Sequence, residues 1–117
     1  MVIWYQSLRY LVRCVSERHR VRITVLRKFR PGEVFTSEQV KGSPVDACSL
    51  FTQGQEFTVD ESGRMPEGFC AWAWDDLYKV VTTLRFGGDF SWFEDLGVSV
   101  NCCTDGLRPV IFKLERI

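Results

Sequence analysis

The segment "CAWAWDDLYKVVTTLRFGG" (70–88) constrains the fold of this 117-residue chain more than any other stretch. Its apolar residues recur at spacings of three and four, which is the periodicity of an amphipathic helix. A glycine pair, Gly87 and Gly88, stands where a helix C-cap belongs. We therefore predict one long helix that buries this stripe against a second layer. The stripe consists of Cys70, Ala73, Trp74, Leu77, Val81 and Leu84.

The segments on both sides of this helix show the two-residue alternation of half-buried strands. An Asp-Gly turn signal at 105–106 predicts that the last two strands form an antiparallel hairpin. Residues 21–117 are therefore expected to form a single α+β domain, in which a small antiparallel sheet of about four strands carries the helix on one face. The alternating segments are "VRITVLRKF" (21–29), "QEFTV" (55–59), "VSVNCC" (98–103) and "RPVIFKLERI" (108–117).

The first twenty residues are predicted to form an N-terminal extension of this domain. Trp4, Leu8, Leu11, Val12 and Val15 follow a helical spacing, so residues 1–20 are interpreted as helical. Polar and charged residues interrupt the apolar ones, which matches neither a secretory signal nor a membrane span.

Composition narrows the classes of partner. Fifteen basic and fifteen acidic residues cancel, so no overall field draws the chain to nucleic acid. With 45% hydrophobic residues the chain can bury a core without disulfides. Its five cysteines are an odd number, which favours reduced thiols. We therefore expect a cytoplasmic protein that binds neither nucleic acid nor membrane.

The cysteines are the main carriers of possible chemistry. Structural zinc sites usually take their ligands from closely spaced pairs such as C-x2-C, and Cys48, Cys70, Cys102 and Cys103 contain no such pair. A zinc site would therefore need ligands from separate elements. Strand alternation places Cys102 on the face of the strand's valines and Cys103 on the opposite face. We therefore predict that Cys102 points inward and that Cys103 is a bystander.

Cys70 stands at the first turn of the predicted helix, where free amides and the helix dipole favour a thiolate. The interpretation that the sequence favours is nevertheless a small buried apolar residue that begins the stripe, because buried, inert cysteines are common. Cys48 would approach Cys70 if its loop folds over the start of the helix. Trp72 lies off the apolar stripe and, if it is exposed, indicates a ligand-binding face or a dimer interface.

Three segments, "CSLFTQGQEFTV", "MPEGFCAWAWDDLYKVVTTLRFGG" and "CCTDGLRPVIFKLERI", resemble those of a family of small cysteine-containing proteins from bacteria and archaea. The resemblance runs from Val21 to Ile117, and residues 1–20 depart from it. It implies a shared site at Cys48, Cys70 and Cys102 together with the "TDGLRP" turn, and it implies no particular reaction.

Three functions are compatible with these patterns. The first is a small binding domain in which Cys48, Cys70 and Cys102 hold a metal ion such as zinc or a small ligand. The second is a thiol redox protein in which Cys70 attacks and Cys48 or Cys102 resolves. The third is a structural or protein-interaction module with cysteines only in its core, whose aromatic face pairs with itself, as a homodimer, or with another protein. No catalytic residue is assigned. The secondary site candidates are Cys103, Trp72, Asp105 and Arg108.

Overall fold

The computed structural model describes residues 17–37, 41–42 and 46–117 of the chain. Residues 1–16 of the predicted helical extension lie outside the described residues, and residues 17–20 lead into the first strand without helical structure. The helices and strands are β1 (Val21–Lys28), α2 (Pro31–Val34), β2 (Glu56–Val59), α3 (Ala71–Arg85), β3 (Val98–Cys102) and β4 (Val110–Arg116).

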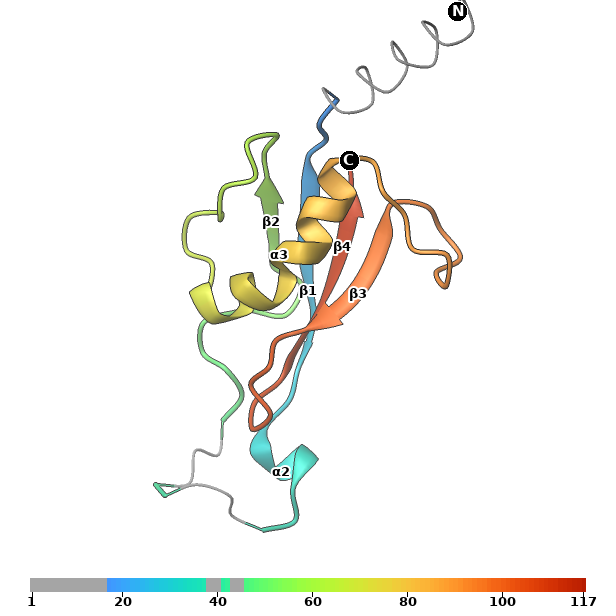
Figure 1. Cartoon of the computed structure of the whole chain (residues 1–117). Helices are drawn as coiled ribbons and strands as arrows, with labels where there is room; N and C mark the ends of the chain where they lie inside the picture. Colours follow the sequence, from blue (N-terminus) through green and yellow to red (C-terminus); the bar gives the residue numbers. More distant parts are fainter. Residues whose placement is uncertain (1–16, 38–40, 43–45) are drawn as a thin grey trace, which may run out of the picture.

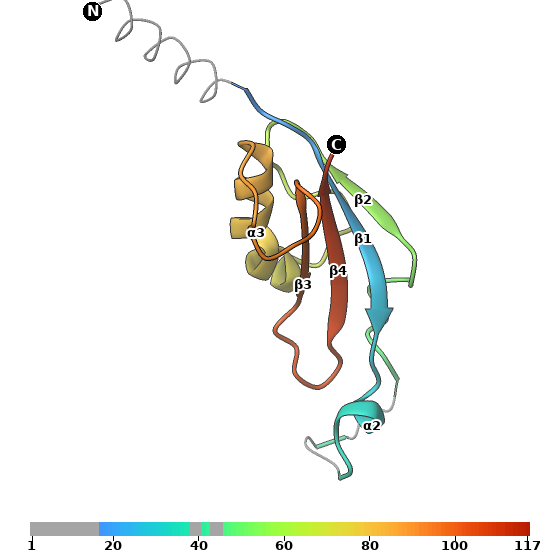
Figure 2. The same ribbon diagram turned by 90° about the vertical axis from the view of Figure 1, so that its right-hand side faces the viewer.

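The four strands form one antiparallel sheet in the order β2-β1-β4-β3. α3 lies across one face of this sheet, and Figures 1 and 2 show that no described helix covers the other face. β3 and β4 pair as the predicted hairpin. The predicted α+β fold, with one main helix packed on a four-stranded antiparallel sheet, is therefore confirmed.

The core lies between α3 and the sheet. Alternate residues of β1 and β4 face the helix, and Phe51 and Phe69 fill the space beside them. Burying each such aliphatic or aromatic side chain contributes about 1.5–3 kcal/mol, so this layer dominates the stability of the fold. Its members include Val21, Ile23, Val25, Val110, Phe112 and Leu114 of the sheet and Ala73, Leu77, Val80, Val81 and Leu84 of α3.

α3 begins and ends close to the predicted positions. Cys70 is the N-cap residue, and its side chain makes no capping hydrogen bond. At the other end, the amide of Gly87 donates to the carbonyl of Leu84 at 3.1 Å. Arg116 of β4 donates to the carbonyl oxygens of Leu84 at 3.3 Å and Gly88 at 2.8 Å. The last strand therefore supplies donors to carbonyl groups at and just after the C-terminal end of the helix, where the regular hydrogen bonds of the helix stop.

The segment "RPGEVF" (30–35) lies outside every predicted helix and strand, and it holds the one-turn helix α2. Pro31 suits the first helical position, where no amide donor is needed. The Glu33 carboxylate accepts the amide of Arg30 at 3.0 Å, and the Phe35 amide donates to the carbonyl of Pro31 at 2.8 Å. These local hydrogen bonds close a single turn.

The prediction for the cysteine doublet was wrong: Cys103, and not Cys102, points inward. Ser99 and Cys103 are 3% and 8% exposed, whereas Cys102 is exposed. The β3–β4 register explains this orientation, because Ser99 pairs with Leu114, and directly opposed residues of an antiparallel pair project from the same face. Leu114 faces α3, so the odd-numbered residues of β3 face it too.

Candidate ligand-binding pocket

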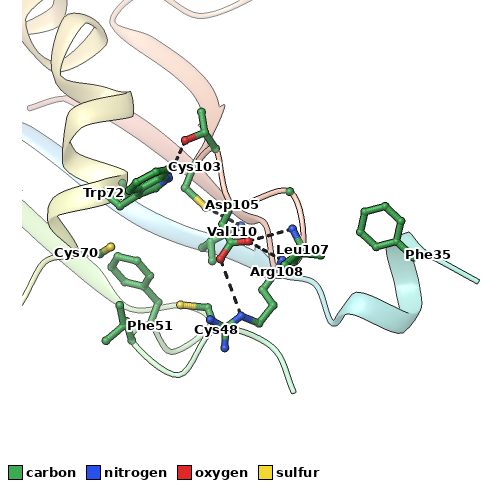
Figure 3. Close-up of a pocket in the computed structure, with 14 residues that line it drawn as sticks. Phe35, Cys48, Phe51, Cys70, Trp72, Cys103, Asp105, Leu107, Arg108 and Val110 are labelled. Carbon is green, nitrogen blue, oxygen red and sulfur yellow. Dashed lines mark hydrogen bonds and ion pairs between the residues drawn. The ribbon is translucent and has the colours of Figure 1, made fainter. Parts of the chain in front are cut away.

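A pocket of about 520 Å³ lies where α3 begins and the β3–β4 turn leaves the sheet. It draws its lining from four separate parts of the chain (Figure 3). These are the end of α2, the loop before β2, the first turn of α3 and the β3–β4 turn. The lining residues are Phe35, Cys48, Leu50, Phe51, Cys70, Trp72, Ala73, Cys103, Thr104, Asp105, Gly106, Leu107, Arg108 and Val110.

The first turn of α3 is tied to the β3–β4 turn by side-chain hydrogen bonds. The Trp72 indole nitrogen donates to the Thr104 hydroxyl at 2.7 Å. The Thr104 amide donates to the Asp76 carboxylate at 2.7 Å. Trp72, which makes this connection, and Cys70, which precedes the same turn of α3, both line the pocket. Two of the predicted site residues therefore lie in one wall of the pocket.

Asp105 and Arg108 form the turn that makes the opposite wall. The Asp105 carboxylate accepts the amides of Leu107 at 3.0 Å and Arg108 at 3.1 Å, which is an Asx-type turn. The Arg108 guanidinium lies 3.9 Å from the same carboxylate. The two charges therefore balance each other at the pocket.

Cys48 enters the pocket from the loop before β2. Lys28 of β1 holds this loop by donating to the carbonyl oxygens of Cys48 at 3.0 Å and Phe51 at 2.7 Å. Phe51 is buried and meets Phe112 edge to face, with ring centroids 5.1 Å apart. In Figure 3, Phe51 lies between Cys48 and Cys70, and both cysteines pack partly buried against the core.

Cys103 supplies the third thiol. Its sulfur accepts the amide of Val110 at 3.4 Å, a contact drawn as a dashed line in Figure 3. Burial raises the pKa of the Cys103 thiol, and the neighbouring Asp105 charge adds to the increase, while hydrogen bonds from the backbone oppose it. Cys103 therefore stays a neutral thiol at neutral pH and contributes a soft, weakly polar surface.

The pocket brings together six of the seven predicted site residues: Cys48, Cys70, Cys103, Trp72, Asp105 and Arg108. Cys102 is the exception, because it is exposed on the face of the sheet that α3 leaves uncovered. Within residues 17–37, 41–42 and 46–117, no group of three or more His, Cys, Asp or Glu side chains is arranged to hold a metal ion. The structure therefore does not assemble Cys48, Cys70 and Cys102 as a zinc site.

Several apolar lining residues were not predicted. Three of them lie in loops and turns, where apolar residues do not recur at a regular spacing that could reveal a buried face. These are Phe35, Leu50 and Leu107. The signal that could have found Leu50 is its place beside Phe51 in a loop. Phe51 is buried in the core, whereas Leu50 is 61% exposed at the pocket.

Comparison of the chain with protein-family models, with curated proteins and with solved structures finds no match. Among the described residues, no helix is long and apolar enough to span a membrane.

Proposed function

We propose that this domain binds a small, largely apolar molecule in the pocket between α3 and the β3–β4 turn. The observation that carries the proposal is the convergence of four chain segments on a pocket of about 520 Å³. This volume falls within the range of roughly 300–1,000 Å³ that is typical of small-molecule sites. Of the three positions at which the resemblance predicted a shared site, Cys48 and Cys70 line this pocket and Cys102 does not.

The chemistry of the lining indicates the class of ligand. Aromatic and aliphatic side chains supply most of the wall, and Arg108, the single cation among the lining residues that the structure describes, is paired with Asp105. A pocket with balanced charge and apolar walls favours a neutral aromatic or aliphatic molecule. The thiols of Cys48, Cys70 and Cys103 then provide soft contacts for sulfur, aromatic or halogen atoms of the ligand.

Peptide-resolved alkylation tests this proposal, with the neutral, apolar dye N-phenyl-1-naphthylamine as the probe. N-ethylmaleimide is added with and without the dye, and modification is followed by mass spectrometry at each cysteine. We expect the dye to slow labelling of Cys48 and Cys70, because both line the pocket. Labelling of Cys102 should not change, because this thiol lies outside the pocket. Equal protection of all three thiols, or protection of none, would rule out the pocket as the binding site.

A pair of leucine variants completes the test. Leu50→Ala removes an exposed apolar side chain from the pocket wall and should weaken dye binding, whereas Leu96→Ala removes an even more exposed leucine elsewhere. An equal loss of dye binding in the two variants would mean that the dye reports general surface hydrophobicity.

A thiol redox function that uses Cys70 is the second candidate. It is favoured by the presence of Cys48 and Cys70, both as free thiols, in the same pocket. With hydrogen peroxide as the oxidant, the Cys70 sulfur would take one oxygen to form a sulfenic acid, releasing one water. The Cys48 thiol would then attack the sulfenic acid sulfur of Cys70, which forms a disulfide and releases a second water. A Cys48–Cys70 disulfide after peroxide treatment, detected by mass spectrometry, supports this function. Oxidation that begins at Cys102 contradicts it.

A further inference from the structure

β3 is an edge strand of the sheet. It pairs with β4 on one side, and none of the described strands pairs with its other side. The carbonyl of Gly97 accepts the amide of Arg116 at 2.8 Å, and the amide of Cys103 donates to Val110 at 3.1 Å. Because backbone groups alternate in direction along a strand, the odd-numbered residues of β3 direct theirs to β4.

The N–H and C=O groups of Val98, Val100 and Cys102 therefore point away from the sheet, along its free edge. A row of unpaired backbone groups is a template for a further strand, and sheets usually protect such edges with charged residues. The opposite edge strand, β2, has this protection, since it is only four residues long and carries Glu56. β3 is longer, and its sequence VSVNC contains no charged residue.

We propose that β3 pairs antiparallel with β3 of a second copy of this chain, with Val100 on the two-fold axis. In this register Val100 lies opposite Val100 of the second copy, and Val98 lies opposite Cys102. These are the residues whose backbone groups are free, so each opposed pair exchanges both of its N–H···O hydrogen bonds. A register shifted by one residue in either direction leaves some of these groups unpaired.

The side chains suit the same arrangement. On the uncovered face, the side chain of Val98 contacts that of Cys102 of the second copy, and both side chains are apolar. On the α3 face, Ser99 meets Asn101 of the second copy, and both can form hydrogen bonds. No charged residue of β3 meets a like charge, and the two sheets become one continuous sheet through an isologous contact.

The surroundings of the edge offer apolar contacts to a second copy. A hollow of about 340 Å³ lies beside Ser99, Val100 and Asn101, with Phe90 and Trp92 among its other lining residues. Trp92 is 74% exposed on the loop that leads into β3, and Leu96 of the same loop is 79% exposed. Large apolar side chains concentrated beside an unpaired edge are typical of an interface with another chain.

Light scattering after gel filtration of the full chain tests the pairing. We expect a mass of twice 13.6 kDa that falls toward 13.6 kDa on dilution. Val100→Lys places two ammonium groups against each other on the axis and should yield the monomer at concentrations where the wild type is dimeric. Thr58→Lys on the other edge strand is the matched control and should remain dimeric. A wild type that is monomeric at every concentration, or a dimer that survives Val100→Lys, overturns the proposal.

A crosslinking experiment covers the case in which a lysine disturbs the fold. In a chain that carries Cys14→Ser and Cys102→Ser, Val100→Cys places two thiols on the axis. The Cα separation of about 5.5 Å in a hydrogen-bonded pair suits a disulfide. Mild oxidation should then produce a covalent dimer on a non-reducing gel, whereas Thr58→Cys in the same background should not. Equal crosslinking of the two variants would contradict pairing through β3.

Discussion

The indole nitrogen of Trp72 donates a 2.7 Å hydrogen bond to the hydroxyl of Thr104, a residue 32 positions further along the chain. This bond joins the first turn of α3 to the β3–β4 turn, and Asp76 reinforces it from the next turn of the helix. Two walls of the pocket are thus held together by a few polar contacts. These contacts hold the β3–β4 turn against the first turn of α3, in addition to the packing of the buried core.

Asp76→Ala is expected to destabilise the protein by about 0.5–1.5 kcal/mol, because the amide and hydroxyl of Thr104 lose their acceptor. Asp75→Ala is the matched control, since Asp75 is the exposed neighbour in the same helix. Its free energy of unfolding should stay within about 0.5 kcal/mol of the wild type. Urea denaturation measures both. Equal losses in the two variants would mean that helix charge, and not the contact with Thr104, sets the effect.

The pKa of Asp89 gives the protein a sensitivity to acid. The hydrogen bond from the Arg116 guanidinium, at 2.7 Å, is the main cause of a lowered pKa, and the amide of Gly97 adds to it. A carboxyl group whose pKa is lower in the folded state stabilises the fold at pH values above about 4, which is its pKa in the unfolded chain. This contribution disappears as the pH falls through the folded value.

Asp89→Asn should therefore lose less stability than the wild type between about pH 5 and pH 2.5, because asparagine does not titrate. Urea denaturation at a series of pH values measures the difference. Glu94→Gln in the same loop is the control and should follow the wild-type curve. An Asp89→Asn curve parallel to that of the wild type would show that the contact with Arg116 does not favour the carboxylate.

Cys102 and Cys103 should differ in reactivity although they are neighbours in the sequence. Burial raises the pKa of Cys103 and shields its sulfur, whereas Cys102 is exposed. At mildly alkaline pH, iodoacetamide should modify Cys102 several-fold faster than Cys103, as followed by peptide mass spectrometry. Denaturation should abolish the difference. If Cys103 reacted faster than Cys102 in the folded protein, this would contradict the inward orientation of Cys103 that follows from the β3–β4 register.

Gly63→Ala is expected to be among the most damaging single substitutions in a loop. Gly63 has φ of 76°, and a Cβ atom there would collide with the Arg85 guanidinium, which is buried and donates to the Glu61 carbonyl at 2.5 Å. Gly54→Ala separates the two causes, because Gly54 has φ of 86° with open space around it. Gly54→Ala should cost about 1–2 kcal/mol for the backbone conformation alone.

Thermal and urea denaturation should show a larger loss for Gly63→Ala than for Gly54→Ala, because only Gly63→Ala also displaces a buried cation from its acceptor. Losses of equal size would mean that Arg85 can move aside without cost.

The buried faces of α3 and β4 were predicted correctly from periodicity, whereas the buried face of β3 was not. The helical stripe through Leu77 and the alternation of Val110, Phe112 and Leu114 are local signals that repeat over several turns or pleats. Each repeat constrains the same face, so the signal is strong. The short turn α2 was missed because a single turn has no periodicity, and its hydrogen bonds are visible only in the structure.

The sequence by itself determined that Cys102 and Cys103 point to opposite faces, since alternation is a property of any strand. Which of them points inward was decided by tertiary structure, through the pairing of Ser99 with Leu114 across the hairpin. The pocket was decided in the same way. Its walls come from segments far apart in the chain, and their meeting depends on long-range packing around Phe51, which no local pattern encodes.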